Sequence, residues 1–192
     1  MSDDNDPPIP SAPVQQILAA ARFAAEKHAS QRRKGLAGEP YVNHVIEVAE
    51  LIAASSDVVD THLVMAGLLH DTIEDCGVTF QELEQQFGAD VATLVAEVTD
   101  DKTLPKARRK ALQVENAPKK SVRAQVIKLA DKISNLRSIL DSPPADWDLE
   151  RRRQYFEWAH QVISGLRNPN PLLKAEFDEI YSRYEQRLQP RG

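Results

Sequence analysis

The sequence predicts an all-α fold, a single-domain helical bundle. Apolar residues recur at three- and four-residue spacing in one segment after another, which is the period of a helix that buries one face. No segment shows the apolar–polar alternation of a half-buried strand. The 192 residues are enough for one domain with a substantial core. We therefore expect amphipathic helices joined by polar connections around one core.

The chain begins with a segment that favours disorder. Residues 1–12 contain three aspartates and several prolines, which neither a helix nor a sheet accommodates well. A first helix is expected from Val14 to about Ala29, with Val14, Leu18 and His28 on its apolar face. We interpret His28 as a core histidine, or as one that supports a site from behind, in preference to a metal ligand.

Three helices are then expected before the middle of the chain. One begins near Asn43, a residue type that often caps a helix, and carries His44 in its first turn. The next covers residues 58–69 and is followed directly by His70 and Asp71. Thr79 and Glu82 have the spacing of a capping box, which predicts a short helix to Phe87 that ends at Gly88.

The second half of the chain continues the helical pattern. Helices are expected over residues 89–99, 119–140, 147–166 and 172–188. Residues 100–106 form a polar connection that carries two lysines. Asp131 follows a strongly apolar stretch in the long helix, so an aspartate there needs a partner.

The composition limits the kind of partner. The net charge of −5 is mild and of the wrong sign for a general nucleic-acid binder, so an anionic ligand must be attracted by a local basic patch. The single cysteine, Cys76, excludes an intramolecular disulfide framework. No apolar run approaches the length of a membrane span, and the first residues are acidic where a secretory signal is basic. We therefore expect a cytoplasmic protein with no membrane partner.

The stretch Ala66–Asp75 contains the strongest signal for chemistry. An apolar run ends in the doublet His70-Asp71, and the next turn adds Glu74 and Asp75. Residues four apart share one face of a helical turn, so four ionisable groups converge there. Burying them unpaired would cost several kcal/mol, and a metal ion is the first candidate to compensate them. The alternative is an exposed acidic helix end with a satisfied histidine.

A basic loop precedes the second helix. It contains three consecutive cations, Arg32, Arg33 and Lys34, followed by Gly35. Glycine allows a ligand to approach the backbone closely, and arginine and lysine both bind phosphate. The loop is therefore a candidate phosphate site, and the alternative is a solvated basic turn.

These motifs together resemble a known family. The order of a lone histidine, His44, a doublet, His70-Asp71, and a distant Asp131 is similar to the HD superfamily of metal-dependent phosphohydrolases. The stretches Arg33–Gly35, Leu69–Asp75 and Lys128–Lys132 more narrowly resemble the hydrolase domain of RelA/SpoT proteins. The resemblance is greatest to the stand-alone, metazoan-type SpoT homologues, which are small alarmone hydrolases. It covers about residues 14–188 and implies one HD-type helical domain over residues 13–192.

The resemblance implies an activity and a site. The family hydrolyses the 3′-pyrophosphate of guanosine tetra- or pentaphosphate, (p)ppGpp, to give GDP or GTP and pyrophosphate. The expected ligands of one Mn²⁺ ion are His44, His70, Asp71 and Asp131. The expected catalytic acids, which would assist the attacking water, are Glu74 and Asp75. The expected substrate-binding residues are Arg33, Lys34, Asn135, Lys102, Lys106, Arg151 and Tyr155.

Two other functions fit the same residues. The site could remove the 2′-phosphate of NADPH, because 2′ and 3′ substituents of a ribose are close in space. A non-catalytic nucleotide-binding module would keep the fold, although such proteins are expected to lose ligands that this chain retains. A dinuclear HD phosphodiesterase is disfavoured because His62 and His160 lie outside any ligand motif. The expected partner is a small nucleotide, and the oligomeric state is left open.

Overall fold

The computed structural model describes residues 12–188, and all regular structure in that range is helical, as the sequence predicts. The predicted tail over residues 1–12 lies, except for Ala12, outside the described residues. The helices run as follows: α1 (Pro13–Lys27), α2 (Val42–Ala54), α3 (Thr61–Leu69), α4 (Thr72–Cys76), α5 (Phe80–Phe87), α6 (Ala89–Val98), α7 (Lys106–Asn116), a short 3₁₀ turn (Ala117–Lys119), α8 (Val122–Asp141), α9 (Leu149–Ser164) and α10 (Pro171–Leu188).

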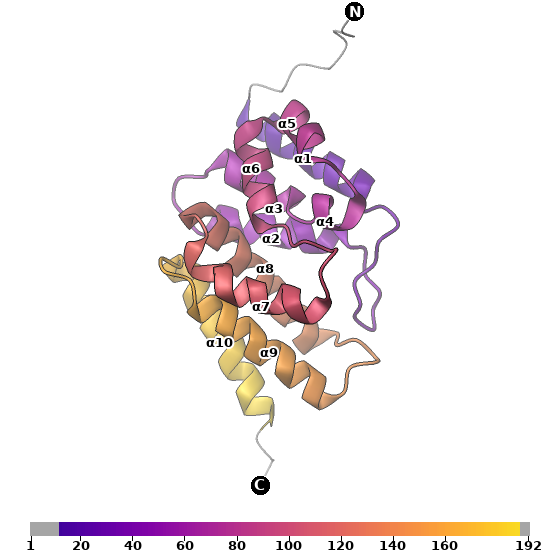
Figure 1. Cartoon of the computed structure of the whole chain (residues 1–192), viewed down its shortest axis with the longest axis vertical. Coiled ribbons are helices and arrows are strands. Elements are labelled where there is room, and N and C mark those ends of the chain that lie inside the picture. Colours follow the sequence, from indigo (N-terminus) through magenta and orange to yellow (C-terminus); the bar gives the residue numbers. More distant parts are fainter. Residues whose placement is uncertain (1–11, 189–192) are drawn as a thin grey trace, which may run out of the picture.

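The helices form two groups joined by α8. Helices α1 to α6 lie in one half of the molecule, and α7, α9 and α10 lie in the other (Figure 1). Helix α8 contacts α2, α3 and α6 on one side and α9 and α10 on the other. Its apolar positions Leu129, Ile133 and Leu136 have no exposed surface. Burial of an apolar stripe on both sides explains why one long helix holds the two halves together.

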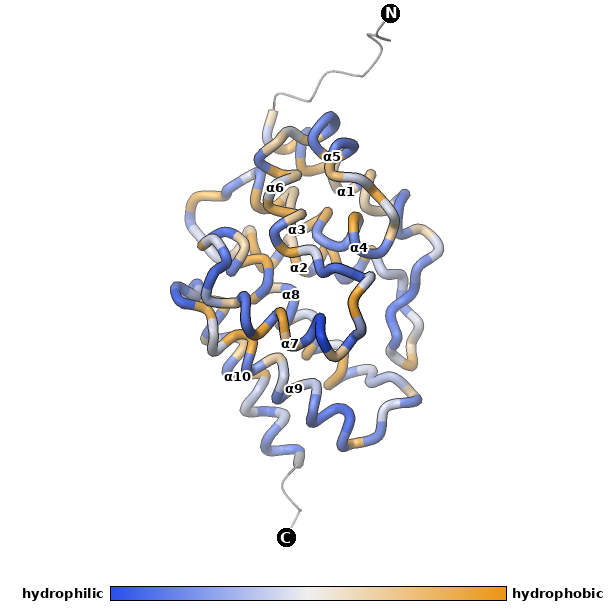
Figure 2. Tube along the Cα trace, viewed as in Figure 1, coloured by the Kyte–Doolittle hydropathy of each residue, from blue (hydrophilic) through white to orange (hydrophobic). Residues whose placement is uncertain are grey.

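Helix α3 is buried on all sides, because every residue from Leu63 to Leu69 is buried. The trace of α3 is accordingly among the most apolar parts of the chain, whereas the outer end of α9 is hydrophilic (Figure 2). Gly67 lets α3 approach α2 closely, since a Cβ there would lie 2.5 Å from Cδ1 of Ile52. The rigid helix α3 therefore places its last residue, and His70 after it, in the centre of the molecule.

Several helix ends differ from the sequence-based expectations. Helix α2 begins at Val42, so Asn43 lies inside the first turn and is not its N-cap. Helix α3 begins three residues later than predicted, because the side chain of Asp60 accepts from the backbone N–H of Leu63 at 3.0 Å. Thr79 caps α5 as predicted.

The expected apolar face of α1 was partly wrong. Val14 and Leu18 are exposed, and α1 buries Ala20, Phe23 and Ala24 in their place. His28, which follows the helix, is buried as predicted. The helix therefore packs against the core through its C-terminal half.

Helix α7 was not predicted. It follows the polar connection at residues 99–105, and none of its residues is buried. Its only large apolar residues are Leu112 and Val114, and a helix with so few apolar residues gives little of the signal on which sequence patterns depend. None of the helices in the described part of the chain is long and apolar enough to cross a membrane.

Candidate active site

Two histidine rings meet at the centre of the molecule. His44 lies in the first turn of α2 and His70 directly follows α3, and their ring centroids are 5.2 Å apart. Both are buried, and the Nε2 atom of each is buried with no hydrogen-bond partner. Nδ1 of His70 lies 2.8 Å from the carbonyl oxygen of Gly67, which can only accept, so this nitrogen carries the hydrogen. Nε2 of His70 is therefore the nitrogen that faces the cluster, and it can bind a metal ion once its proton is released.

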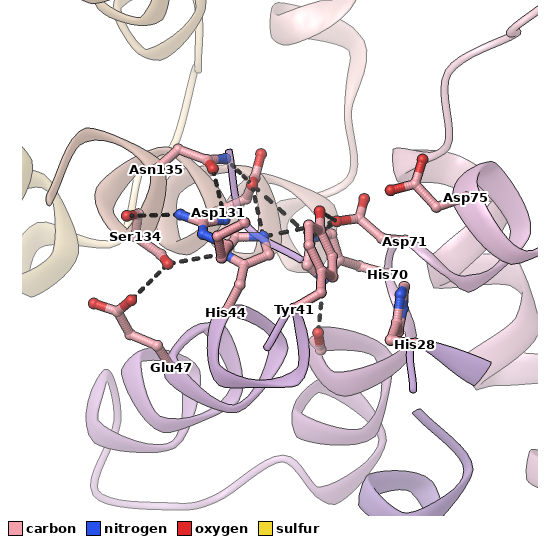
Figure 3. Close-up of polar contacts among 12 residues, drawn as sticks. His28, Tyr41, His44, Glu47, His70, Asp71, Asp75, Asp131, Ser134 and Asn135 are labelled. Atoms are coloured by element: carbon pink, nitrogen blue, oxygen red, sulfur yellow. Dashed lines mark hydrogen bonds and ion pairs between the residues drawn. The ribbon is translucent and has the colours of Figure 1, made fainter. Parts of the chain in front are cut away.

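Two aspartates face these Nε2 atoms (Figure 3). Oδ2 of Asp71 lies 3.1 Å from Nε2 of His70 and 3.7 Å from Nε2 of His44. Oδ1 of Asp131 lies 3.5 Å from Nε2 of His44 and 3.9 Å from Nε2 of His70. The donor atoms of His44, His70 and Asp131 all lie within 4.8 Å of one another. The structure thus brings together the four side chains that the sequence predicts as metal ligands.

Neighbouring side chains hold the two carboxylates in place. The hydroxyl of Tyr41 donates to Asp71 at 2.6 Å. Asp131 accepts from the ammonium group of Lys132 at 2.7 Å and from the amide of Asn135 at 2.5 Å. Asn135 was predicted as a substrate contact, and it also supports this ligand.

The electrostatics of the cluster favour a positive charge at its centre. Burial alone would lower the pKa of His70, but Asp71 and Asp131 outweigh it and raise the pKa of His70 to about 9. Burial would raise the pKa of Asp71, but His70 and His44 hold it well below its usual range. A divalent cation supplies the same compensating charge.

The buried Nε2 atoms of His44 and His70 indicate that the four side chains fit a metal ion. Two buried, unpartnered imidazole nitrogens facing two ionised carboxylates would be costly without a shared cation. Imidazole and carboxylate together suit a borderline divalent metal, with positions left for water and phosphate.

The two predicted catalytic acids lie beside this cluster and are held separately. Glu74 accepts from the backbone N–H of Asp100 at 3.2 Å and from Arg109 at 3.3 Å. Asp75 accepts from the amide of Gln31 at 2.8 Å and from the ammonium group of Lys102. Burial, and then the charge of Asp71, raises the pKa of Glu74 above its usual value.

A cavity of about 350 Å³ opens onto the cluster, and an adjoining cleft of about 430 Å³ shares much of its wall. The two are joined through Lys34, Lys106, Asn135 and Tyr155, which line both. Lys102 lines the first cavity only, and Arg33 and Arg151 line the second. All seven residues predicted to bind substrate therefore face one continuous space beside the candidate metal site.

Sequence reasoning missed further cations around this space. Arg109 and Lys110 come from the unpredicted helix α7, and Lys128 and Lys132 come from α8. The ammonium group of Lys110 lies 4.5 Å from the ring centre of Trp158 on α9. Of these four cations, only Lys128 and Lys132 could have been inferred from the sequence, from their positions on either side of Asp131.

The remaining histidines lie outside the ligand cluster. Nδ1 of His28 lies 2.7 Å from Oε1 of Gln31, so His28 supports the residue that binds Asp75, as interpreted from the sequence. The exposed His62 pairs with Asp90 at 2.8 Å. The ring of His160 packs against that of Tyr181.

Comparisons with known proteins show the family to which the chain belongs. An HD domain family model matches residues 20–161. The chain is 48% identical over 165 residues to the Xenopus tropicalis protein named guanosine-3′,5′-bis(diphosphate) 3′-pyrophosphohydrolase MESH1, covering 86% of this chain and 92% of that one. It is also 48% identical over 168 residues to the Homo sapiens protein of the same name, covering 88% and 94%.

A solved structure shares the fold. The structure described as a metazoan ortholog of SpoT that hydrolyzes ppGpp superposes with a TM-score of 0.85, at 46% identity, over 92% of this chain and 98% of that one. The family match spans more than half of the chain and includes every proposed metal ligand. The chain belongs to the HD domain family, in the group that contains the metazoan SpoT homologues.

Proposed function

We propose that this protein is a manganese-dependent (p)ppGpp 3′-pyrophosphohydrolase. The observation that carries the proposal is the pair of unpartnered Nε2 atoms of His44 and His70, which face Asp71 and Asp131 at the base of a cation-lined cavity. The names of relatives at 48% identity support this substrate over other phosphate esters. The products are GDP or GTP and pyrophosphate.

His44, His70, Asp71 and Asp131 would hold the metal ion. Manganese is the metal we propose, because two imidazoles with two carboxylates form a mixed ligand set and manganese accepts carboxylate and water readily. When bound, such an ion lowers the pKa of a water molecule and polarises a phosphoryl oxygen. Chain residues supply the remaining steps.

Glu74 is the better placed of the two acids to take the proton of the attacking water. It lines the cavity with His70 and Asp71, and its raised pKa makes it a stronger base than an exposed carboxylate. Asp75 is already bound by Gln31 and Lys102, so we assign it to orienting the water or the substrate. In the reaction, the water oxygen bonds to phosphorus, and the 3′ oxygen of the ribose leaves and gains a proton.

The cations of the cavity would bind the phosphates. Lys34 and Lys106 line both parts of the space and have no ion pair with a carboxylate of the described residues, so their charges are available to a ligand. The indole of Trp147 and the phenol of Tyr155 line the outer cleft and offer aromatic surface to a base. A nucleotide with several phosphates therefore fits the positive charge of the space. It also fits the division of the space into an inner cavity beside the metal site and an outer cleft with aromatic side chains.

The competing substrate is NADPH, whose 2′-phosphate could reach the same metal position. Both substrates are nucleotides and would use the same cations and the same water. The choice between them depends on which ribose position lies over the metal site, and kinetic comparison decides it. We place either reaction in the cytoplasm, in keeping with a chain that has a single cysteine.

The test is a substrate panel on the manganese-loaded protein. We expect release of GDP and pyrophosphate from ppGpp, with a higher kcat/KM than release of phosphate from NADPH. Asp131→Asn should abolish both activities, because it removes a charged ligand. A higher kcat/KM for NADPH would contradict the proposed substrate, and no turnover of either nucleotide would favour a non-catalytic binding module.

A further inference from the structure

A chain of hydrogen bonds lies behind His44, on the side away from the proposed metal. Nδ1 of His44 lies 2.8 Å from the hydroxyl oxygen of Ser134 on α8, and that hydroxyl donates to Glu47 on α2 at 2.6 Å. Figure 3 shows the three side chains in succession. The side chain of His44 and the whole of Ser134 have no exposed surface, and the side chain of Glu47 is 31% exposed.

The direction of these bonds follows from the chemistry of the three groups. The carboxylate of Glu47 can only accept, so the hydroxyl hydrogen of Ser134 points toward Glu47. The oxygen of Ser134 then accepts from His44, which must carry its hydrogen on Nδ1. In that tautomer the lone pair is on Nε2, the atom that faces Asp71 and Asp131.

A guanidinium group fixes the far end of this chain. Nη1 of Arg137 lies 2.8 Å from Oε1 of Glu47, and its second nitrogen binds Glu176 on α10. Arg137 forms ion pairs with both Glu47 and Glu176 and so links α2, α8 and α10. These ion pairs orient Oε2 of Glu47 toward Ser134. Glu47 and Glu176 are equally exposed partners of the same arginine, but only Glu47 reaches Ser134.

We propose that Ser134 and Glu47 are positioning residues for the metal centre, acting through the tautomer and ring orientation of His44. This inference rests on the metal site of the proposed function. Groups that hydrogen-bond the distal nitrogen of a ligating histidine commonly raise metal affinity, and their loss costs about 10- to 100-fold. For His70 the same task is performed by the backbone carbonyl of Gly67, so the His44 side is the one that substitution can test.

The experiment measures manganese affinity without nucleotide, so it is independent of turnover. Metal-free protein is titrated with Mn²⁺, and free Mn²⁺ is followed by electron paramagnetic resonance, with circular dichroism as a check on folding. We expect Ser134→Ala and Glu47→Ala to weaken binding by about 10- to 100-fold. Glu47→Gln keeps an oxygen that can accept from Ser134, so it should recover part of the affinity.

Glu176→Ala is the matched control, because it removes a carboxylate from Arg137 without touching Ser134. Its manganese affinity should equal that of the wild type. Equal losses in Glu47→Ala and Glu176→Ala would assign the effect to the arginine pair and overturn the proposal, as would unchanged affinity in Ser134→Ala. If the wild type bound no manganese, the proposed metal site itself would fail. The proposed role of the hydrogen-bond relay from His44 through Ser134 to Glu47 would then fail with it.

A second measurement reads the tautomer directly. Nitrogen NMR shifts of His44 in the metal-free protein distinguish a hydrogen on Nδ1 from one on Nε2. We expect Nδ1–H in the wild type and in Glu176→Ala, and a mixture of tautomers in Ser134→Ala. A hydrogen on Nε2 in the wild type would contradict the proposed relay.

Discussion

At the scale of single residues, the site holds its carboxylates through different partners. Asp71 and Asp131 receive hydrogen bonds from Tyr41, Lys132 and Asn135, which fixes their oxygens toward the two imidazoles. Glu74 is instead held by the backbone of Asp100 and by Arg109, and it keeps a raised pKa. The ligand carboxylates are thus kept ionised, while the proposed base is adapted to exchange a proton.

The raised pKa of Glu74 predicts a pH dependence. A general base acts in its ionised form, so kcat/KM for ppGpp should fall as the pH decreases through the pKa of Glu74, above the usual 4.5 of a glutamate. Glu74→Gln should lower kcat by about 100-fold or more and remove that acidic limb. The assay is run at saturating Mn²⁺, with bound metal measured at each pH. An unchanged limb in Glu74→Gln would assign it to another group.

Glu74 also depends on a neighbouring cation, which gives a matched pair of variants. Arg109 lies 3.3 Å from Glu74, whereas Arg108 points to solvent and pairs with Glu115 at 2.7 Å. Arg109→Met should lower kcat by about three- to tenfold, the loss of a hydrogen bond to a partly exposed charge. Arg108→Met should leave kcat unchanged. Equal kinetics for the two variants would show that Arg109 does not position Glu74.

At the scale of elements, the metal site and the substrate space are built from different kinds of structure. The proposed ligands come from α2, from the end of α3 and from α8, which pack against one another in the core. The substrate space is lined mainly by the basic loop at residues 31–41 and by the surface helices α7 and α9, and α8 adds Lys128, Lys132 and Asn135. A rigid centre therefore holds the metal, and peripheral elements supply the phosphate contacts.

A substitution at Gly35 should displace the basic loop without changing its charges. A Cβ on Gly35 would clash with the backbone oxygen of Ser142 and lie 2.8 Å from its hydroxyl oxygen, so Gly35→Ala should push the loop away from the end of α8. We expect KM for ppGpp to rise by about tenfold, the loss of one or two charge-assisted contacts. Manganese affinity should stay unchanged. Leu36→Ala, at a residue 70% exposed, is the control; an equal KM for the two variants would contradict this role of the loop.

At the scale of the whole molecule, the fold class could be predicted from the local apolar pattern of the helices, whereas the expected ligands came from the resemblance to the HD superfamily, whose motifs are short stretches of sequence. His70 and Asp71 are adjacent in the chain, and His44 and Asp131 belong to motifs that amphipathic helices carry. The relay from Ser134 to Glu47 joins residues 87 positions apart, and no local pattern signals such a contact. Helix α7 was missed for a related reason, since it lies on the surface and buries none of its residues.

Metal binding should also stabilise the whole fold, because the proposed ligands come from α2, from the turn after α3 and from α8. A ligand that binds only the folded state adds about 2.7 kcal/mol at 100 times its dissociation constant. Thermal unfolding should therefore shift upward with Mn²⁺ in the wild type and shift little in Asp131→Asn. An equal shift in both proteins would show that manganese stabilises them elsewhere.

The most direct test of the central claim is a titration of activity with metal. Chelator-treated protein is supplied with increasing Mn²⁺, and GDP formation from ppGpp is measured at each addition. The proposed site of His44, His70, Asp71 and Asp131 predicts no activity at the start and a linear rise that ends at one equivalent of manganese per chain. Full activity in the metal-free protein, or a rise that ends only at two equivalents, would contradict a single-metal phosphohydrolase.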